Sequence, residues 1–117
     1  MRDEVVLFEQ FRIGAHAAGH ASWQIEIVTG IIESSENAED VARREAVEES
    51  GCQIGELVLI CEGLASPGIM TETIAIYCGR VDVAIAGGVY GLAAEHEDIR
   101  AISLAAEEAM TWPATAA

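Results

Sequence analysis

Residues 37–51 constrain the fold more than any other segment, because they carry a complete set of helix signals. Strong helix formers run from Ala38 to Ser50, Asn37 is a favoured N-cap residue, and Gly51 suits the left-handed residue that ends a helix. Apolar and alternating runs on either side predict the strands Val5–Phe11, Trp23–Ile27, Leu57–Ala65, Thr71–Val83 and Ile99–Leu104, and Ala105–Trp112 has a short helical pattern. This arrangement indicates an α/β class.

Three connections have the composition of loops. Residues 12–20 are rich in Gly, Ala and His, and Ser66-Pro67-Gly68 is a turn sequence between two predicted strands. The segment Ala84–Asp98 is Gly-rich and then acidic, and it is too long for a tight turn. Connections of that length inside a compact domain are usually functional or disordered.

Length and charge limit the class of protein. A chain of 117 residues has room for one hydrophobic core, so residues 1–117 are expected to form a single domain. The net charge of −14, from 20 acidic and 6 basic residues, argues against nucleic acid or an acidic membrane as partner. No apolar run reaches the roughly 18 residues that span a bilayer, and residues 1–4 lack the apolar segment of a secretion signal. The expected location is the cytoplasm.

The cysteines and histidines give weaker signals. Cys52, Cys61 and Cys78 are widely spaced in apolar settings without a CxxC pair, so buried thiols are expected in place of disulfides or a zinc site. The histidines lie in two predicted loops and are expected to face solvent: His16, His20 and His96.

Three carboxylates, Glu45, Glu48 and Glu49, are spaced so that a helix places them close together. At 100° per residue, positions i, i+3 and i+4 fall within about a quarter to a third of the circumference. Like charges at this spacing repel each other, and Arg43 and Arg44 are expected on the opposite face. A hard divalent cation such as Mg2+ would neutralise the carboxylates, because Mg2+ prefers oxygen ligands. A solvated Glu-rich helix is the alternative that these three residues alone leave open.

The wider spacing favours the metal site. Gly30 is followed after five residues by Glu36, and after seven more by Arg44-Glu45-Ala46-Val47-Glu48-Glu49-Ser50-Gly51-Cys52. This pattern is similar at every fixed position to the signature of the Nudix hydrolase superfamily, and a chance match at a given start is of order one in a hundred million. Gly30 is expected to let the backbone turn tightly. Arg44 is expected to hold Glu36 or a helix carboxylate, with a simple surface ion pair as the alternative.

Segments outside this signature resemble the ADP-ribose pyrophosphatases of the superfamily. Leu7–Arg12 is similar to a strand that ends in a substrate-binding Arg, and Glu26–Gly30 is similar to the strand that leads into the signature. Ser66–Gly68 with Glu72 is similar to the loop that follows the signature. Gly91–Ile99 is similar to a catalytic loop. The glycines before the acidic part of the last segment also fit a hinge that closes carboxylates over a substrate. A solvated acidic turn is the alternative.

The resemblance implies a role for individual residues. The implied metal ligands are Glu45, Glu49, Glu97 and the backbone carbonyl of Thr29. Glu48 would bind a further metal ion or support the other ligands, and it is the next candidate for the general base. Glu95 is the implied general base. The implied substrate contacts are Arg12 at the diphosphate and Ser66, Gly68 and Glu72 near the terminal ribose or the phosphates. The cofactor is Mg2+, for which Mn2+ can substitute.

The resemblance also implies an α/β/α sandwich with a mixed β-sheet and Mg2+-dependent hydrolysis of a nucleoside diphosphate linked to another group. The expected small-molecule substrate is ADP-ribose, cleaved to AMP and ribose 5-phosphate. Compared with that family, the chain is expected to lack an N-terminal segment and a C-terminal extension. Trp23, Phe8 or Phe11 would then lie on an exposed apolar surface, which predicts a homodimer. The alternatives are a pyrophosphatase for a GDP-sugar or an oxidised nucleoside triphosphate, and a catalytically silent binding module.

Overall fold

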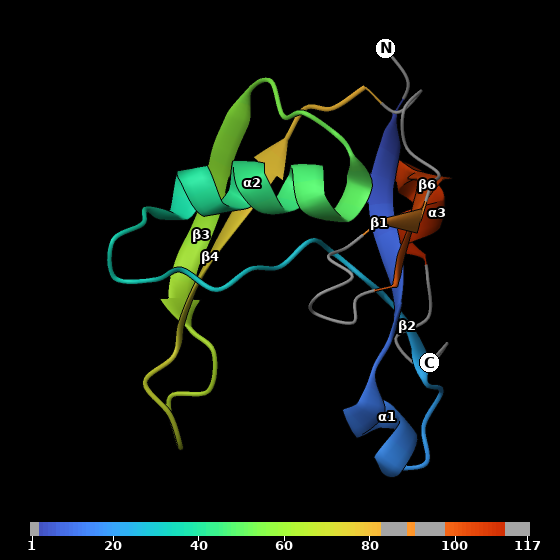
Figure 1. Ribbon diagram of the computed structural model, residues 1–117, viewed down its shortest axis with the longest axis vertical. Coiled ribbons are helices and arrows are strands. Elements are labelled where there is room, and N and C mark those ends of the chain that lie inside the picture. The colour runs from blue at the N-terminus through green and yellow to red at the C-terminus, as the bar shows by residue number, and fades with distance from the viewer. Residues whose placement is uncertain (1–2, 83–88, 91–97, 112–117) are drawn as a thin grey trace.

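The structure, a computed structural model, describes residues 3–82, 89–90 and 98–111. Figure 1 shows the arrangement of its helices and strands. In chain order the elements are β1 (Glu4–Phe11), α1 (Ile13–Ala17), β2 (Trp23–Glu26), α2 (Ala38–Ser50), β3 (Leu57–Leu64), β4 (Thr73–Gly79), β5 (Val89–Tyr90), β6 (Ile99–Ala105) and α3 (Ala106–Met110).

Four strands form one sheet in the order β2-β1-β6-β5. The central strand β1 pairs with β2, where Phe8 lies opposite Glu26, and with β6, where Phe8 lies opposite Ala101. Strands β3 and β4 form a separate two-stranded sheet, the β3–β4 hairpin, with a register irregularity between Leu59 and Cys61. Every pairing between described strands is antiparallel. The presence of both helices and strands confirms the α/β class. Among the described strands there is no parallel pairing, which a mixed sheet requires.

The helix α2 connects the two sheets. It extends from the hairpin side of the molecule toward the four-stranded sheet, where it contacts β6 and β5 (Figure 1). The core at this junction consists of Phe8, Ile99 and Ala101, with Val6 and Val28 packed against it. The buried apolar residues Val41, Ala46 and Cys52 belong to α2 or directly follow it. The face of the sheet that carries Phe8 is therefore the face toward α2.

The local predictions hold for most elements. The predicted helix Ala38–Ser50 is α2 with the same bounds, and the predicted strands correspond to β1, β2, β3, β4 and β6 with shifted ends. The expected loop after Arg12 instead contains the short helix α1, followed by Gly19 at φ 80°. Within the segment Ala84–Asp98, the structure describes only the strand β5 and Asp98. None of the described helices has the length and apolar character needed to cross a membrane.

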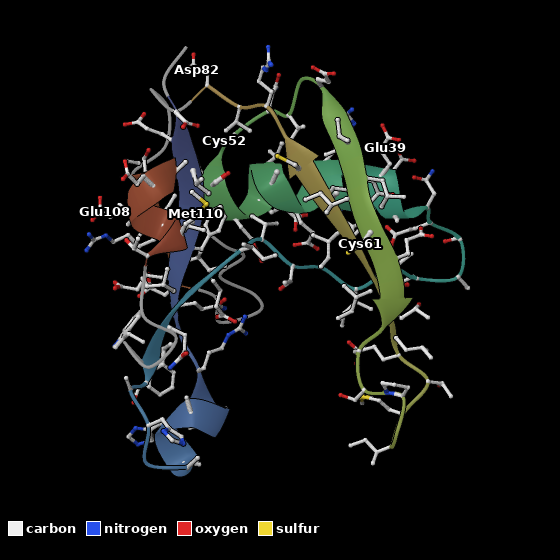
Figure 2. The ribbon with its side chains drawn as sticks, turned by 180° about the vertical axis from the view of Figure 1, so that it is seen from behind. Glu39, Cys52, Cys61, Asp82, Glu108 and Met110 are labelled. Atoms are coloured by element: carbon white, nitrogen blue, oxygen red, sulfur yellow. The ribbon has the colours of Figure 1, made fainter. Side chains whose placement is uncertain are left out.

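Two expectations about burial are wrong in part. Phe8 is buried in the core, whereas Phe11 and Trp23 are exposed as expected and meet edge to face at 5.9 Å between ring centroids. Cys52 is buried, but Cys61 and Cys78 are exposed. Figure 2 shows Cys52 beside the end of α2 and Cys61 on the hairpin. The reason is that Cys61 and Cys78 share one face of a two-stranded sheet with Ile76 and Val58, and the described residues leave that face uncovered.

The cysteines and two of the histidines agree with the remaining predictions. The three cysteines are free, as expected. His16 and His20 are exposed, as expected, and His96 lies outside the described residues.

Candidate active site

The helix α2 is fixed at both ends by the caps that its sequence predicts. The Asn37 side chain accepts a hydrogen bond from the backbone N–H of Asp40 at 2.9 Å. At the other end, Gly51 adopts φ 69° and its N–H donates to the carbonyl of Val47 at 2.9 Å. Glycine tolerates this left-handed conformation without the clash that a Cβ would cause. These caps set the residues at which the helix begins and ends.

The three signature carboxylates are shielded from water to different degrees. Glu49 is 7% exposed, and the side chains of Glu45 and Glu48 are 16% and 29% exposed. Removing a carboxylate from water is costly unless cations or hydrogen-bond donors compensate its charge. The helix thus presents two strongly shielded carboxylates one turn apart, with the more accessible Glu48 beside them.

Gly30 lies directly against one of these carboxylates. A Cβ built on Gly30 would be 2.4 Å from Cγ, 2.7 Å from Cδ and 2.8 Å from Oε1 of Glu45. Any side chain at position 30 would therefore displace the Glu45 carboxylate. The prediction that Gly30 serves a tight turn is wrong, because residues 27–33 form neither a turn nor a bend and Gly30 lacks a positive φ. The glycine instead lets the Glu45 carboxylate approach the backbone next to Thr29.

Arg44 lies among the acidic residues of the signature. It forms an ion pair with Glu36, and its guanidinium also reaches Glu45 at 3.5 Å and Glu48 at 4.0 Å. The predicted contact of Arg44 with Glu36 is confirmed, and its bracing role stays a prediction. The expectation that Arg44 lies on the face opposite the carboxylates is wrong, because its long side chain turns toward them. Arg43 instead donates to the carbonyl of Ile54 at 2.7 Å and so ties α2 to the segment before β3.

The pKa of Glu36 is held below its ordinary value. The backbone N–H of Glu33 donates to its carboxylate at 3.1 Å and is the main cause, and the Arg44 guanidinium adds to the effect. The same contact with Glu36 raises the pKa of Arg44. The loop before α2 is therefore attached to the helix by an ion pair that remains charged under mildly acidic conditions.

Arg12, the predicted diphosphate contact, is held by Glu26 at the end of the sheet. Its Nε and Nη2 donate to the two carboxylate oxygens at 2.6 Å and 3.3 Å. The backbone N–H of Arg12 donates to the carbonyl of Ser22 at 2.7 Å, and His16 Nδ1 lies 2.9 Å from Ser22 Oγ. Residues directly opposite in a sheet share a face, so Arg12 contacts, through Glu26, the face of the sheet that carries Phe8.

Three further predicted residues lie away from Arg12 and from the α2 carboxylates. Ser66, Gly68 and Glu72 lie in the exposed connection between β3 and β4, at the end of the hairpin that points away from α2 (Figure 1). That connection is closed by hydrogen bonds of its own, from Ala65 N–H to the Glu72 carbonyl at 2.9 Å and from Met70 N–H to the Ser66 carbonyl at 3.0 Å. Glu95 and Glu97 lie outside the described residues.

The signature residues fit a divalent cation chemically. Glu45 and Glu49 supply hard oxygen donors, and the space that a Cβ of residue 30 would fill lets Glu45 reach the backbone that carries the Thr29 carbonyl. Within residues 3–82, 89–90 and 98–111, no group of three or more His, Cys, Asp or Glu side chains is already arranged to hold a metal ion.

Comparison with known proteins decides the family. A family model described as the NUDIX domain matches residues 1–115. The chain belongs to the Nudix family. The resemblance inferred from the spacing of residues 30–52 is thereby confirmed.

Similar proteins give this Nudix chain a closer context. It is 46% identical over 112 residues to the ADP-ribose pyrophosphatase of Escherichia coli (strain K12), which is 96% of this chain and 54% of that protein. It is 43% identical over 113 residues to the ADP-ribose pyrophosphatase of Haemophilus influenzae, covering 94% and 52%. Identity to the GDP-mannose pyrophosphatase of Citrobacter koseri is 35% over 114 residues, covering 93% and 56%. The chain spans about half the length of these relatives.

Two features of the Nudix site were missed by reasoning from sequence. The first is the contact between Gly30 and Glu45, which depends on the distance between a loop and a helix. The second is Glu26 as partner of Arg12. The sequence signal for it was the alternation of apolar and polar residues in β2, which makes Gln24 and Glu26 the polar positions. In the structure these two residues lie opposite Gln10 and Phe8. Without the register of β1 against β2, that alternation could not be linked to Arg12.

Proposed function

We propose that this Nudix domain hydrolyses ADP-ribose to AMP and ribose 5-phosphate with Mg2+ as cofactor, and that Mn2+ can replace Mg2+. The observation that carries the proposal is the close contact of Gly30 with Glu45 beside the buried Glu49. The two relatives at 43–46% identity are ADP-ribose pyrophosphatases, which supports ADP-ribose as the substrate. Residues 1–117 are proposed to form a single domain that acts in the cytoplasm on a small-molecule nucleotide, with neither nucleic acid nor a membrane as partner.

The residues on α2 and the segment before it would hold the metal. Glu45, Glu49 and the carbonyl of Thr29 are the proposed ligands, with Glu97 from the acidic loop and Glu48 as support. When bound there, Mg2+ would offset the charge of the diphosphate and lower the pKa of the attacking water. Arg44 holds Glu36 and so keeps the loop in register with the helix.

Arg12 and the acidic loop would act on the substrate. Arg12 is proposed to contact the diphosphate, and Glu95 to take the proton from the water as it attacks phosphorus. The bond between that phosphorus and the bridging oxygen breaks, and the products leave as two phosphate monoesters. Ser66, Gly68 and Glu72 are proposed to contact the terminal ribose or the phosphates.

Measuring products tests the proposal directly. The chain is incubated with ADP-ribose at increasing Mg2+, and AMP and ribose 5-phosphate are quantified. AMP formation that requires a divalent cation is the expected result. A chain that releases no product from ADP-ribose at any Mg2+ concentration contradicts the proposal and favours a binding module. Glu39→Gln is a matched control, because Glu39 pairs with Arg43 on α2 at 3.2 Å outside the proposed site.

Two variants separate a base from a ligand in the acidic loop. Glu95→Gln is expected to lower turnover by about a hundredfold or more with unchanged Mg2+ dependence, because a lost general base slows proton transfer. Glu97→Gln is expected to raise the Mg2+ concentration needed for half activity, because an amide ligand carries no charge. If both variants match the parent, the loop is a solvated acidic turn and Glu48 becomes the candidate base.

A GDP-sugar is the second candidate substrate. The 35% identity to a GDP-mannose pyrophosphatase favours it. Including GDP-mannose in the same assay distinguishes the two, since GMP would then replace AMP as the nucleotide product. A higher kcat/KM for GDP-mannose than for ADP-ribose would transfer the proposal to that substrate.

A homodimer is proposed as the functional assembly. Apolar side chains exposed on the β3–β4 hairpin support it, including Val58, Ile60, Leu64, Ile74 and Ile76. Surfaces of this kind commonly mark interfaces between proteins. Light scattering at micromolar concentration tests the proposal, and a mass matching the 12.4 kDa monomer would contradict it.

A further inference from the structure

Glu26 binds one edge of the Arg12 guanidinium. The Arg12 and Glu26 side chains are 41% and 33% exposed, so the pair is partly shielded from water. The hydrogen bonds at Nε and Nη2 fix the guanidinium plane as well as its position, because two parallel donors meet two oxygens. Glu26 therefore determines the direction in which the rest of Arg12 points.

The other edge of the guanidinium has no hydrogen-bond partner within residues 3–82, 89–90 and 98–111. Nε and one N–H of Nη2 are used by Glu26, which leaves both N–H groups of Nη1 and the second one of Nη2. Among the residues that the structure describes, Nη1 of Arg12 makes no hydrogen bond. This free edge has the planar fork that binds two oxygens of one phosphate group.

Glu26 also connects Arg12 to the signature. It lies opposite Phe8 in the sheet, and Val28, two residues later, packs against the core that contains Phe8. Gly30, two residues further on, contacts Glu45. One short stretch of chain thus carries the partner of Arg12, a core contact and the contact with the α2 carboxylate.

We propose that Glu26 is a positioning residue for substrate binding, which holds Arg12 with its free edge turned toward the diphosphate of the substrate. This inference rests on the proposed function, because it takes Arg12 as the diphosphate contact. Glu26 itself touches no substrate and acts through Arg12.

The negative charge of Glu26 and its two hydrogen bonds to Arg12 have opposite effects on substrate binding. A carboxylate near a diphosphate repels it, so removing that charge alone would strengthen substrate binding. Removing the two hydrogen bonds frees the guanidinium to rotate. Substrate binding is then weaker, because the rotational freedom of the guanidinium is lost when the complex forms. A positioning role predicts that the second effect is the larger.

The experiment compares Glu26→Gln with the parent on ADP-ribose at saturating Mg2+. The expected result is a KM raised about tenfold, the scale for losing a hydrogen bond to a charged group, with an unchanged Mg2+ requirement. In an Arg12→Ala background, the same change should alter KM by less than about twofold, because Glu26 acts through Arg12. Glu26→Asp, which keeps the charge on a shorter side chain, should also raise KM. Glu39→Gln, which removes a surface ion pair, should match the parent.

Inorganic pyrophosphate separates this inference from the proposed function. Its binding with Mg2+ is measured by calorimetry for the parent, Glu26→Gln and Arg12→Ala, with unfolding temperatures as a check on folding. If the parent fails to hydrolyse ADP-ribose but binds pyrophosphate more tightly than both variants, the positioning role stands and the proposed function falls. The positioning role is overturned if the KM of Glu26→Gln equals or falls below that of the parent, if its effect persists without Arg12, or if the parent binds no pyrophosphate.

Discussion

The four-stranded sheet with α2 and the β3–β4 hairpin use apolar residues in opposite ways. In this first region, Phe8 is 5% exposed, Ile99 is fully buried, and the α2 carboxylate Glu49 is 7% exposed. In the hairpin, Ile60 is 62% exposed and Val58 is 53% exposed. Apolar side chains therefore stabilise the first region by packing in its core, whereas those of the hairpin form an exposed surface that a partner could cover. Glu45 and Glu49, the proposed metal ligands, belong to the first of these two regions.

The largest expected effect is on stability in the core. Phe8→Ala should lower the free energy of unfolding by about 3–5 kcal/mol, because it leaves a cavity next to Ile99 and Ala101. Ile60→Ala on the hairpin should change it by less than about 0.5 kcal/mol, because its side chain is already in water. Chemical denaturation measures both. Equal losses would show that the hairpin face is covered in solution, and the contrast between the regions would disappear.

The next effect is on turnover. Glu49→Gln should preserve the fold but reduce turnover by about a hundredfold or more, because the amide keeps the size of the carboxylate and loses the charge that holds a metal. Glu62→Gln on β3 is the hairpin control and should leave turnover unchanged. Steady-state rates in Mg2+ give the comparison. A Glu49→Gln variant with the parent's rate would remove Glu49 from the site.

A smaller loss is expected from Gly30→Ala. The added Cβ would force the Glu45 side chain to move, so we expect turnover to fall by about tenfold while the unfolding temperature changes little. Gly14→Ala is the matched control, because nothing lies within 4 Å of a Cβ at that position. Parallel rate and melting measurements separate the two outcomes. Equal rates for the variants would mean that Glu45 can move without loss of activity.

The smallest effect concerns acid stability. Because folding lowers the pKa of Glu36, its contribution to stability is present above the unfolded pKa of about 4.3 and is lost as pH falls through the lower folded pKa. Glu36→Gln should therefore be less stable than the parent at pH 6, and this difference in stability should shrink as pH falls below the unfolded pKa of Glu36. Denaturation at several pH values without divalent cations measures this. A difference that stays constant with pH would contradict the assignment.

The sequence predicts what depends on neighbours along the chain. The caps at Asn37 and Gly51 define α2, and the helical spacing brings Glu45 and Glu49 together without knowledge of the fold. Burial on the hairpin could not be predicted, because apolar residues such as Cys61 look the same whether or not another layer covers them. The Arg12–Glu26 pair required strand register, which alternation alone does not fix. The direction of the Arg44 side chain was not predictable either, because a long flexible chain can reach either side of a helix.

The way Arg12 is anchored has a consequence for how this domain can be altered. The Arg12 guanidinium is held by Glu26 of β2, and its backbone N–H donates to the carbonyl of Ser22 just before β2. The hydrogen bond from α1, which the His16 N–H donates to the Arg12 carbonyl, involves only the backbone. Residues 13–21 therefore pass from β1 to β2 without supporting the guanidinium. A peptide inserted there, such as an affinity label or a short reporter, should leave Arg12 in place, since exposed connections accept insertions when they bear no essential contacts.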